Sequence, residues 1–198
     1  MSADLVYLAS GSPRRRELLA QIGVPFQVLG VTVDEARFPG EAPDDYVLRL
    51  ARQKADAGWR VRPAQSTAPV LAADTTVVLD GKILVKPTDR SDGERMLREL
   101  GGRTHEVLTA VAVATAAGLH SRTSRSEVTF RAISAAEAHE YWATGEPHDK
   151  AGGYAIQGGA AIFVADLKGS YSGVMGLPLF ETAELLQQAG VSHWSYPR

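Results

Sequence analysis

Residues 9–16 combine small side chains with positive charge at the expected entry to a helix. They read Ala-Ser-Gly-Ser-Pro-Arg-Arg-Arg, and they follow the apolar residues 5–9, which are typical of a buried strand. A helix that begins here presents free backbone N–H groups and the positive end of its dipole, which together bind phosphate. The arginines are unfavourable in that first turn unless a negative ligand binds. The spacing alone leaves both a phosphate site and a solvated basic turn open.

The second candidate is Asp74, a carboxylate inside the apolar run of residues 70–79. An ionised carboxylate is costly to bury unless it is paired or binds a cation. We expect residues 72–76, Ala-Ala-Asp-Thr-Thr, to break the strand and to present Asp74 as a general base or a Mg²⁺ ligand beside a polyphosphate. A turn-capping aspartate is the simpler alternative, and position alone does not exclude it.

Two lysines could supply positive charge to phosphate oxygens. Lys54 lies near the buried edge of the helix expected at residues 44–58, and Lys86 precedes Pro87, which favours an extended backbone. Taken alone, each lysine is more commonly a solvated surface residue. Glu35 is a candidate second carboxylate, although a surface-loop acid is the commoner explanation for its position.

A glycine-rich stretch covers residues 149–159, Asp-Lys-Ala-Gly-Gly-Tyr-Ala-Ile-Gln-Gly-Gly. Glycines allow positive φ and let the backbone approach a ligand closely. Gln157 offers both a donor and an acceptor, which suits the edge of a pyrimidine. A flexible connector is the alternative, but the aromatic and apolar residues between the glycines argue against it.

Alternating strands and helices must position these residues. The patterns predict strands at residues 5–9, 26–28, 70–79, 83–85, 107–114, 123–132 and 161–167, and helices at residues 13–22, 44–58, 89–100, 135–144 and 178–189. Asp80-Gly81 is a hairpin signal, and Ser134 with Glu137 forms a capping box. Because at least two hairpins interrupt the alternation, we expect an α/β fold with a mixed sheet.

The composition is that of an ordinary folded protein, and the 198 residues fit one domain, residues 1–198. The lack of cysteine excludes a disulfide scaffold, a thiolate metal site and a cysteine nucleophile. A net charge of −2 argues against a nucleic acid polymer as partner. No apolar run approaches the ~20 residues of a membrane span. Residues 1–4 lack the basic start of a signal peptide, so we expect no membrane association and a cytoplasmic location.

In combination, these segments resemble the Maf family of nucleotide pyrophosphatases, the septum-formation inhibitors. The similarity comprises, in order, residues 8–15, 73–75, 102–105, 149–158 and 169–179. An ordered set of segments is far more specific than any one of them. The resemblance implies a two-lobed α/β domain, a mixed β-sheet flanked by helices, similar to the inosine-triphosphate pyrophosphatases. It also implies an active site in the cleft between the lobes.

The resemblance further implies a reaction. Water attacks the α-phosphorus of a nucleoside triphosphate and releases the monophosphate and pyrophosphate, with a divalent cation, Mg²⁺ or Mn²⁺, as cofactor. Asp74 is implied as the proton acceptor, and Asp74 and Glu35 are the candidate metal ligands. The residues tied to base choice are Arg14, Thr75 and Gln157. The residues implied to line the phosphate cleft are Ser10, Arg15, Glu35, Lys54 and Lys86. Arg16 receives no role.

Residues 74–76, Asp-Thr-Thr, and 156–158, Ile-Gln-Gly, are similar to the branch of the family that acts on dTTP and UTP rather than on 7-methyl-GTP. The resemblance therefore implies pyrimidine nucleotides, normal or modified, as substrates. It is compatible with a homodimer and with a link to cell-division arrest. Two alternatives stay open: a nucleotide-binding regulator of septum formation whose hydrolysis is incidental, and a purine house-cleaning enzyme, which the Gln157 region disfavours.

Overall fold

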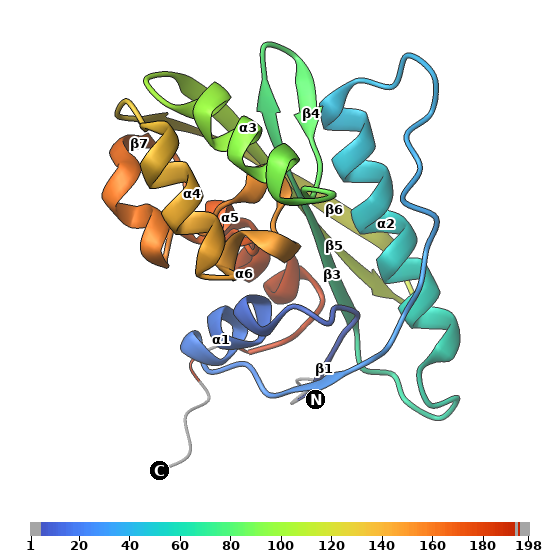
Figure 1. Ribbon diagram of the computed structural model, residues 1–198. Coiled ribbons are helices and arrows are strands. Elements are labelled where there is room, and N and C mark those ends of the chain that lie inside the picture. Colours follow the sequence, from blue (N-terminus) through green and yellow to red (C-terminus); the bar gives the residue numbers. More distant parts are fainter. Residues whose placement is uncertain (1–4, 193, 195–198) are drawn as a thin grey trace.

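One seven-stranded sheet organises the chain (Figure 1). The computed structural model describes residues 5–192 and 194, so residues 1–4, discussed above, lie outside it. The strand order is β2-β1-β3-β5-β6-β7, and β4 pairs with β3. The first strand is parallel to β2 and β3, whereas the other pairings are antiparallel, which confirms the expected mixed sheet. The strands are β1 (Val6–Leu8), β2 (Phe26–Val28), β3 (Val70–Leu79), β4 (Lys82–Leu84), β5 (Thr104–Thr115), β6 (Gly118–Phe130) and β7 (Val164–Lys168).

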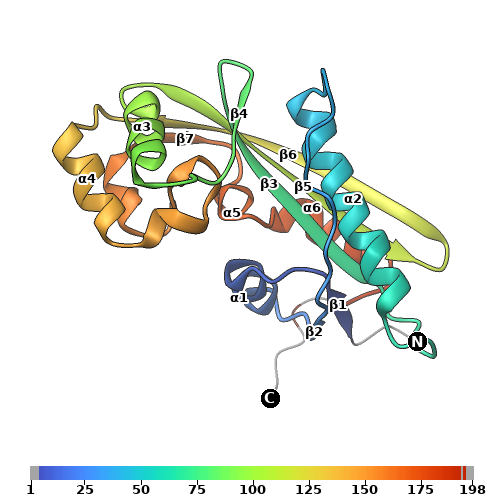
Figure 2. The same cartoon turned by 45° about the vertical axis from the view of Figure 1, so that its right-hand side comes forward.

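Helices pack on both faces of this sheet (Figures 1 and 2). Since alternate strand residues point to opposite faces, β3 separates two cores. Leu71 and Ala73 pack with α1 and α6, while Val70 and Ala72 pack with α2. The helices are α1 (Pro13–Gln21), α2 (Pro43–Val61), α3 (Arg90–Leu100), α4 (Ala135–Ala143), α5 (Tyr171–Met175) and α6 (Leu179–Gln188). Within the described residues, none of the helices is both long and apolar enough to cross a membrane.

A third core lies at the other end of β3. Val77 and Leu79 pack there with Leu97 of α3, Tyr141 of α4 and Phe163. Short 3₁₀ helices at Glu146–Asp149, Ala151–Gly153 and Gly159–Phe163 complete this end. The strands β3 and β5 therefore run through two lobes. We call the part with α1, α2 and α6 the first lobe, and the part with α3, α4 and the 3₁₀ helices the second lobe.

Local chemistry explains several element boundaries. Ser134 and Glu137 form both hydrogen bonds of the predicted capping box. Asp80 and Gly81 have positive φ values of 51° and 74°, as the turn of a two-residue hairpin requires, and they join β3 to β4. Ser12 is the residue before α1, as predicted, although its side chain makes no capping hydrogen bond.

Three predictions about elements were wrong. β3 has no break at residues 72–76, because Asp74 pairs with Ala110 within a continuous ladder to β5 and a lysine compensates its charge. The strand predicted at residues 161–167 begins only at Val164, since Gly159–Phe163 is a 3₁₀ helix. The helix α5 was not predicted at all, because five residues are too few to show helical periodicity.

Candidate active site

A cavity of about 630 Å³ opens between the two lobes. The first lobe lines it with residues 9–15, Glu35 and Lys54, and the second lobe with Lys86 and residues 149–151 and 154–157. Asp74, Thr75 and Thr76 lie along β3 where the lobes meet. Every residue proposed from the sequence for chemistry, phosphate binding or base choice therefore lines this single cavity.

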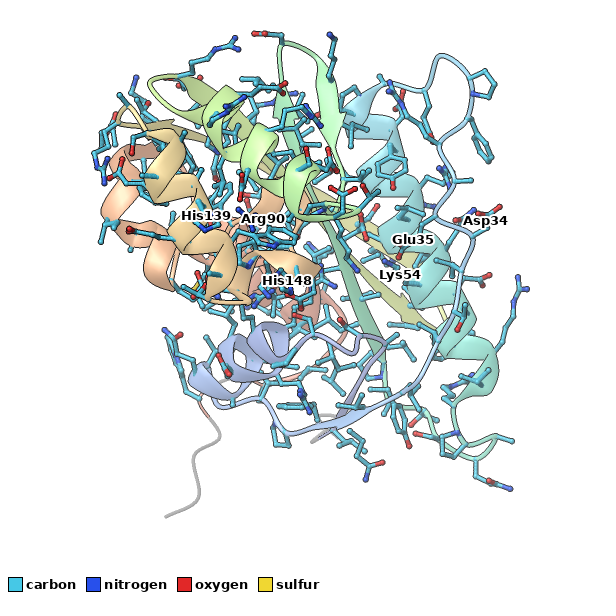
Figure 3. The ribbon with its side chains drawn as sticks, in the orientation of Figure 1. Asp34, Glu35, Lys54, Arg90, His139 and His148 are labelled. Atoms are coloured by element: carbon cyan, nitrogen blue, oxygen red, sulfur yellow. The ribbon has the colours of Figure 1, made fainter. Side chains whose placement is uncertain are left out.

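At the base of the cavity, Lys54 joins two carboxylates. Its Nζ lies 2.7 Å from Oδ1 of Asp74 and 2.6 Å from Oε1 of Glu35. Asp74 is buried on β3, whereas Glu35 is exposed in the loop before α2. Figure 3 shows Glu35 and Lys54 side by side at the inner edge of α2. Two acids from distant segments thus share one cation.

The pKa values of the two carboxylates are shifted in opposite directions. Burial raises the pKa of Asp74 above its ordinary value, and the positive charges of Lys54 and Arg15 act against that rise. The hydrogen bond from Lys54 lowers the pKa of Glu35, which also lies near Lys86 and Arg15. Such a separation of the two pKa values is what an acid–base site needs. Of the two carboxylates, Asp74 is therefore the better proton acceptor.

Two side chains of α2, Tyr46 and Arg49, hold the Glu35 loop against this helix. The Tyr46 hydroxyl donates to the backbone oxygen of Glu35 at 3.1 Å. Arg49, one turn further along α2, donates to both oxygens of Glu41 at 2.6 and 2.8 Å and stacks over Phe38, 4.2 Å from the ring centroid. The loop position is therefore set by α2, the same helix that carries Lys54.

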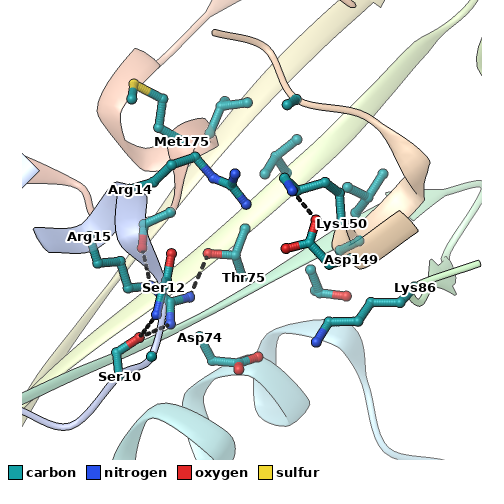
Figure 4. Close-up of a pocket in the computed structure, with 18 of the residues that line it drawn as sticks. Ser10, Ser12, Arg14, Arg15, Asp74, Thr75, Lys86, Asp149, Lys150 and Met175 are labelled. Atoms are coloured by element: carbon teal, nitrogen blue, oxygen red, sulfur yellow. Dashed lines mark hydrogen bonds and ion pairs between the residues drawn. The ribbon is translucent and has the colours of Figure 1, made fainter. Parts of the chain in front are cut away.

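Arg15 is held in one orientation by three protein oxygens (Figure 4). Its Nε donates to the carbonyl of Gly176 at 2.7 Å, Nη1 to the Ser10 hydroxyl at 3.0 Å, and Nη2 to the Thr75 hydroxyl at 3.3 Å. Burial lowers the pKa of Arg15, and the charge of Asp74 opposes this effect. The guanidinium is thus a fixed, partly desolvated cation beside Asp74.

Both lobes contribute further cations to the cavity. Figure 4 shows Arg14 from α1 and Lys150 from the second lobe pointing toward one another, with Lys86 below them. Lys150 pairs with Asp149. Arg16 is exposed and does not line the cavity, as expected from the sequence.

Sequence reasoning gave no role to several residues that line or support this cavity. Asp149 and Lys150 stood inside a recognised segment but carried no specific signal. Met175 ends a helix too short to be predicted, and Gly176 directly follows that helix. Tyr46 falls within the helix expected at residues 44–58, and nothing in its position indicates a role. Only the fold brings these groups to the site.

The donor set fits a divalent cation in a limited way. Asp74 and Glu35 offer oxygens on either side of one nitrogen, and Mg²⁺ is commonly bound by one or two carboxylates together with substrate phosphates. Among the described residues, no group of three or more His, Cys, Asp or Glu side chains is placed to hold a metal. These carboxylates therefore fit a cation that takes its other ligands from a polyphosphate.

Known proteins match this chain in sequence over nearly its whole length. The family of Maf-like proteins matches residues 5–189. The dTTP/UTP pyrophosphatase of Saccharophagus degradans is 59% identical over 194 residues, which cover 98% of this chain and 92% of that relative. The dTTP/UTP pyrophosphatase of Bordetella avium is 53% identical over 193 residues, 94% of this chain and 96% of the relative. Among solved structures, the Staphylococcus aureus Ham1 protein aligns with a TM-score of 0.43 and 15% identity, over 64% of this chain and 71% of that one.

Proposed function

The chain belongs to the Maf family, and from this premise we propose that it hydrolyses dTTP and UTP to the nucleoside monophosphate and pyrophosphate. The observation that carries the proposal is its identity of 59% with a dTTP/UTP pyrophosphatase over nearly the whole chain. The interlobe cavity supports it, because a proton acceptor and a set of cations face the same space.

Asp74 is our candidate for the proton acceptor. A water molecule between Asp74 and the α-phosphorus would lose its proton to the carboxylate as it attacks. A base is most effective when its pKa lies near the working pH, and burial moves the pKa of Asp74 in that direction. Lys54 would keep Asp74 ionised and oriented between turnovers.

The remaining cleft residues would neutralise the polyphosphate, which carries about four negative charges. Ser10 and the start of α1 offer hydrogen-bond donors, and Arg15 offers a fixed positive charge. Lys54 in the first lobe and Lys86 in the second lobe add two further positive charges to the cavity lining. A bound Mg²⁺ or Mn²⁺ at Asp74 and Glu35 would supply further charge neutralisation and lower the pKa of coordinated water.

The base would lie at the other end of the cavity. Ile156, Met175 and Val77 are apolar members of the cavity lining that could contact it, and Gln157 adds a donor and an acceptor. We propose that Gln157, with Arg14 and Thr75, determines base choice. A site that pairs the polar edge of a pyrimidine disfavours bases that leave those groups unpaired. Modified pyrimidine nucleotides belong to the same substrate class.

We also propose that residues 1–198 act as one domain in the cytoplasm, the compartment in which free nucleoside triphosphates are used. The continuous sheet through both lobes supports the single domain.

A panel of nucleotides tests the substrate. The purified chain is incubated with dTTP, UTP and 7-methyl-GTP in the presence of Mg²⁺ or Mn²⁺, and pyrophosphate and phosphate are quantified separately. We expect pyrophosphate from dTTP and UTP and much less from 7-methyl-GTP. Absence of pyrophosphate from both pyrimidine nucleotides would refute the proposal. Chelation of the metal with EDTA should abolish the reaction.

A further inference from the structure

A buried hydroxyl behind the cavity connects three elements, β3, β5 and α5. Thr109 lies on β5 directly opposite Thr75 of β3, and it is fully buried. Its Oγ1 is 2.7 Å from the carbonyl oxygen of Gly173 in α5 and 3.0 Å from Oγ1 of Thr75. Thr109 does not line the cavity, and nothing in the sequence distinguishes it from an ordinary strand residue.

The Thr109 hydroxyl is the donor to both of its partners. A carbonyl oxygen only accepts, so the single proton of Thr109 is shared between the Gly173 carbonyl at 2.7 Å and the Thr75 hydroxyl oxygen at 3.0 Å. The Thr75 oxygen also accepts from Nη2 of Arg15 at 3.3 Å. Thr109 and Arg15 therefore donate to the same oxygen. Hydrogen bonds linked in this way strengthen one another in a low dielectric.

The helix α5 connects this hydrogen-bond network back to Arg15. Gly173 lies in this helix, and Gly176 directly follows it and accepts from Nε of Arg15 at 2.7 Å. Thr109 consequently supports Arg15 from two sides, through the Thr75 hydroxyl and through the placement of α5. The Ser170 hydroxyl caps the same helix by accepting from the Gly173 amide at 2.9 Å.

We propose that Thr109 is a positioning residue, which orients Arg15 for the triphosphate by fixing the Thr75 oxygen to which Arg15 donates and the helix α5 that precedes the Gly176 carbonyl. This inference rests on the function proposed above. One consequence concerns Thr75, whose oxygen accepts from both Thr109 and Arg15 and whose own proton is used by neither. Thr75 would therefore affect substrate choice through Arg15, or as a hydrogen-bond donor, and not as an acceptor.

A double-mutant cycle tests the proposal. Thr109→Val keeps the shape of the side chain and removes the hydroxyl, whereas Thr109→Ser keeps the hydroxyl. We expect Thr109→Val to lower kcat/KM for dTTP about 10-fold, mainly through kcat, and Thr109→Ser to stay within about 3-fold of wild type. In a Thr75→Val background, Thr109→Val should lower kcat/KM by less than about a further 2-fold, because both changes break the same hydrogen-bond network. Thr123→Val, an exposed threonine on β6, is the matched control.

Two results would overturn the inference. The first is that the fold-losses of kcat/KM caused by Thr109→Val and by Thr75→Val multiply in the double variant, as independent changes would. The second is that Thr109→Ser lowers kcat/KM as much as Thr109→Val does. If Thr109→Val does not fold, Thr109→Cys replaces it, since a thiol is a weak donor and should fall between serine and valine.

The crystal structure of the variant provides a readout that does not depend on activity. We expect the guanidinium of Arg15 to leave Thr75 in Thr109→Val and to remain there in Thr109→Ser. An unmoved Arg15 in the valine variant would contradict the inference. A wild-type chain without pyrophosphatase activity would refute the proposed function instead, and the position of Arg15 would still decide the role of Thr109.

Discussion

At the scale of single residues, Asp74 carries the proposed chemistry. Its buried carboxylate makes one ion pair, at 2.7 Å, with a lysine that it shares with Glu35. We expect Asp74→Asn to lower kcat by about 10²–10⁴-fold, the usual contribution of a general base, while the variant remains folded. Initial rates of pyrophosphate release and a thermal melt measure both properties. Asp166→Asn, an exposed aspartate on β7, serves as control and should retain wild-type rates.

The pH dependence of the rate follows from the same residue. Asp74 accepts a proton only when it is ionised, so kcat/KM should rise with pH through its raised pKa. The positive charge of Lys54 favours the ionised form. Lys54→Gln should therefore move the acid limb of the kcat/KM profile to higher pH, beyond any loss of rate at the optimum. A limb that stays in place, or moves to lower pH, would separate Lys54 from the proton acceptor.

At the scale of elements, the capping box of α4 acts on stability alone. The Ser134 hydroxyl accepts from the Glu137 amide at 3.2 Å, and the Glu137 carboxylate accepts from the Ser134 amide at 2.9 Å. Ser134→Ala should lower the unfolding free energy by about 1 kcal/mol, as measured by denaturant unfolding, with unchanged kcat. Ser91→Ala, at an exposed position in the first turn of α3, should change it by less than about 0.5 kcal/mol.

The contact between β5 and the glycine-rich segment adds a pH-dependent contribution to stability. His105 is buried, its Nε2 pairs with the Tyr154 hydroxyl at 2.8 Å, and burial lowers its pKa from 6.5 to about 4. Between pH 6.5 and about 4, His105 is therefore protonated in the unfolded chain but neutral in the folded chain. This contribution is complete above the unfolded pKa and is lost as pH falls toward about 4, by up to about 3 kcal/mol.

The variant His105→Gln isolates this contribution, because glutamine does not titrate and can still pair with Tyr154. The difference in unfolding free energy between wild type and His105→Gln should shrink as pH falls from 6.5 to about 4. A difference that is constant over this window would show that His105 does not titrate with unfolding.

Element type was predictable from sequence where periodicity is long. The helix expected at residues 44–58 is Pro43–Val61, and the central strand expected at residues 107–114 extends to Thr104–Thr115. Local pattern failed where a short segment depends on tertiary contacts. The helix α5 is held by the Ser170 cap and by Thr109, and neither leaves a periodic signal.

At the scale of the whole molecule, the site exists because two lobes share the long strands of one sheet. Sequence chemistry identified candidate groups at residues 10–15, 35, 54, 74, 86 and 157, and the family resemblance implied that they meet. What sequence could not provide is the pairing. Lys54 and Asp74 are 20 positions apart, and Arg15 and Gly176 are 161 apart, so only the fold shows which cation meets which acceptor.

The central claim is that water attacks the α-phosphorus in the cleft between the lobes. Hydrolysis of dTTP in water labelled with oxygen-18 tests it most directly. The products are separated, and mass spectrometry shows which of them carries the label. The account predicts that the heavy oxygen enters thymidine monophosphate and that pyrophosphate stays unlabelled. Label in pyrophosphate, or release of thymidine diphosphate with inorganic phosphate, would contradict it.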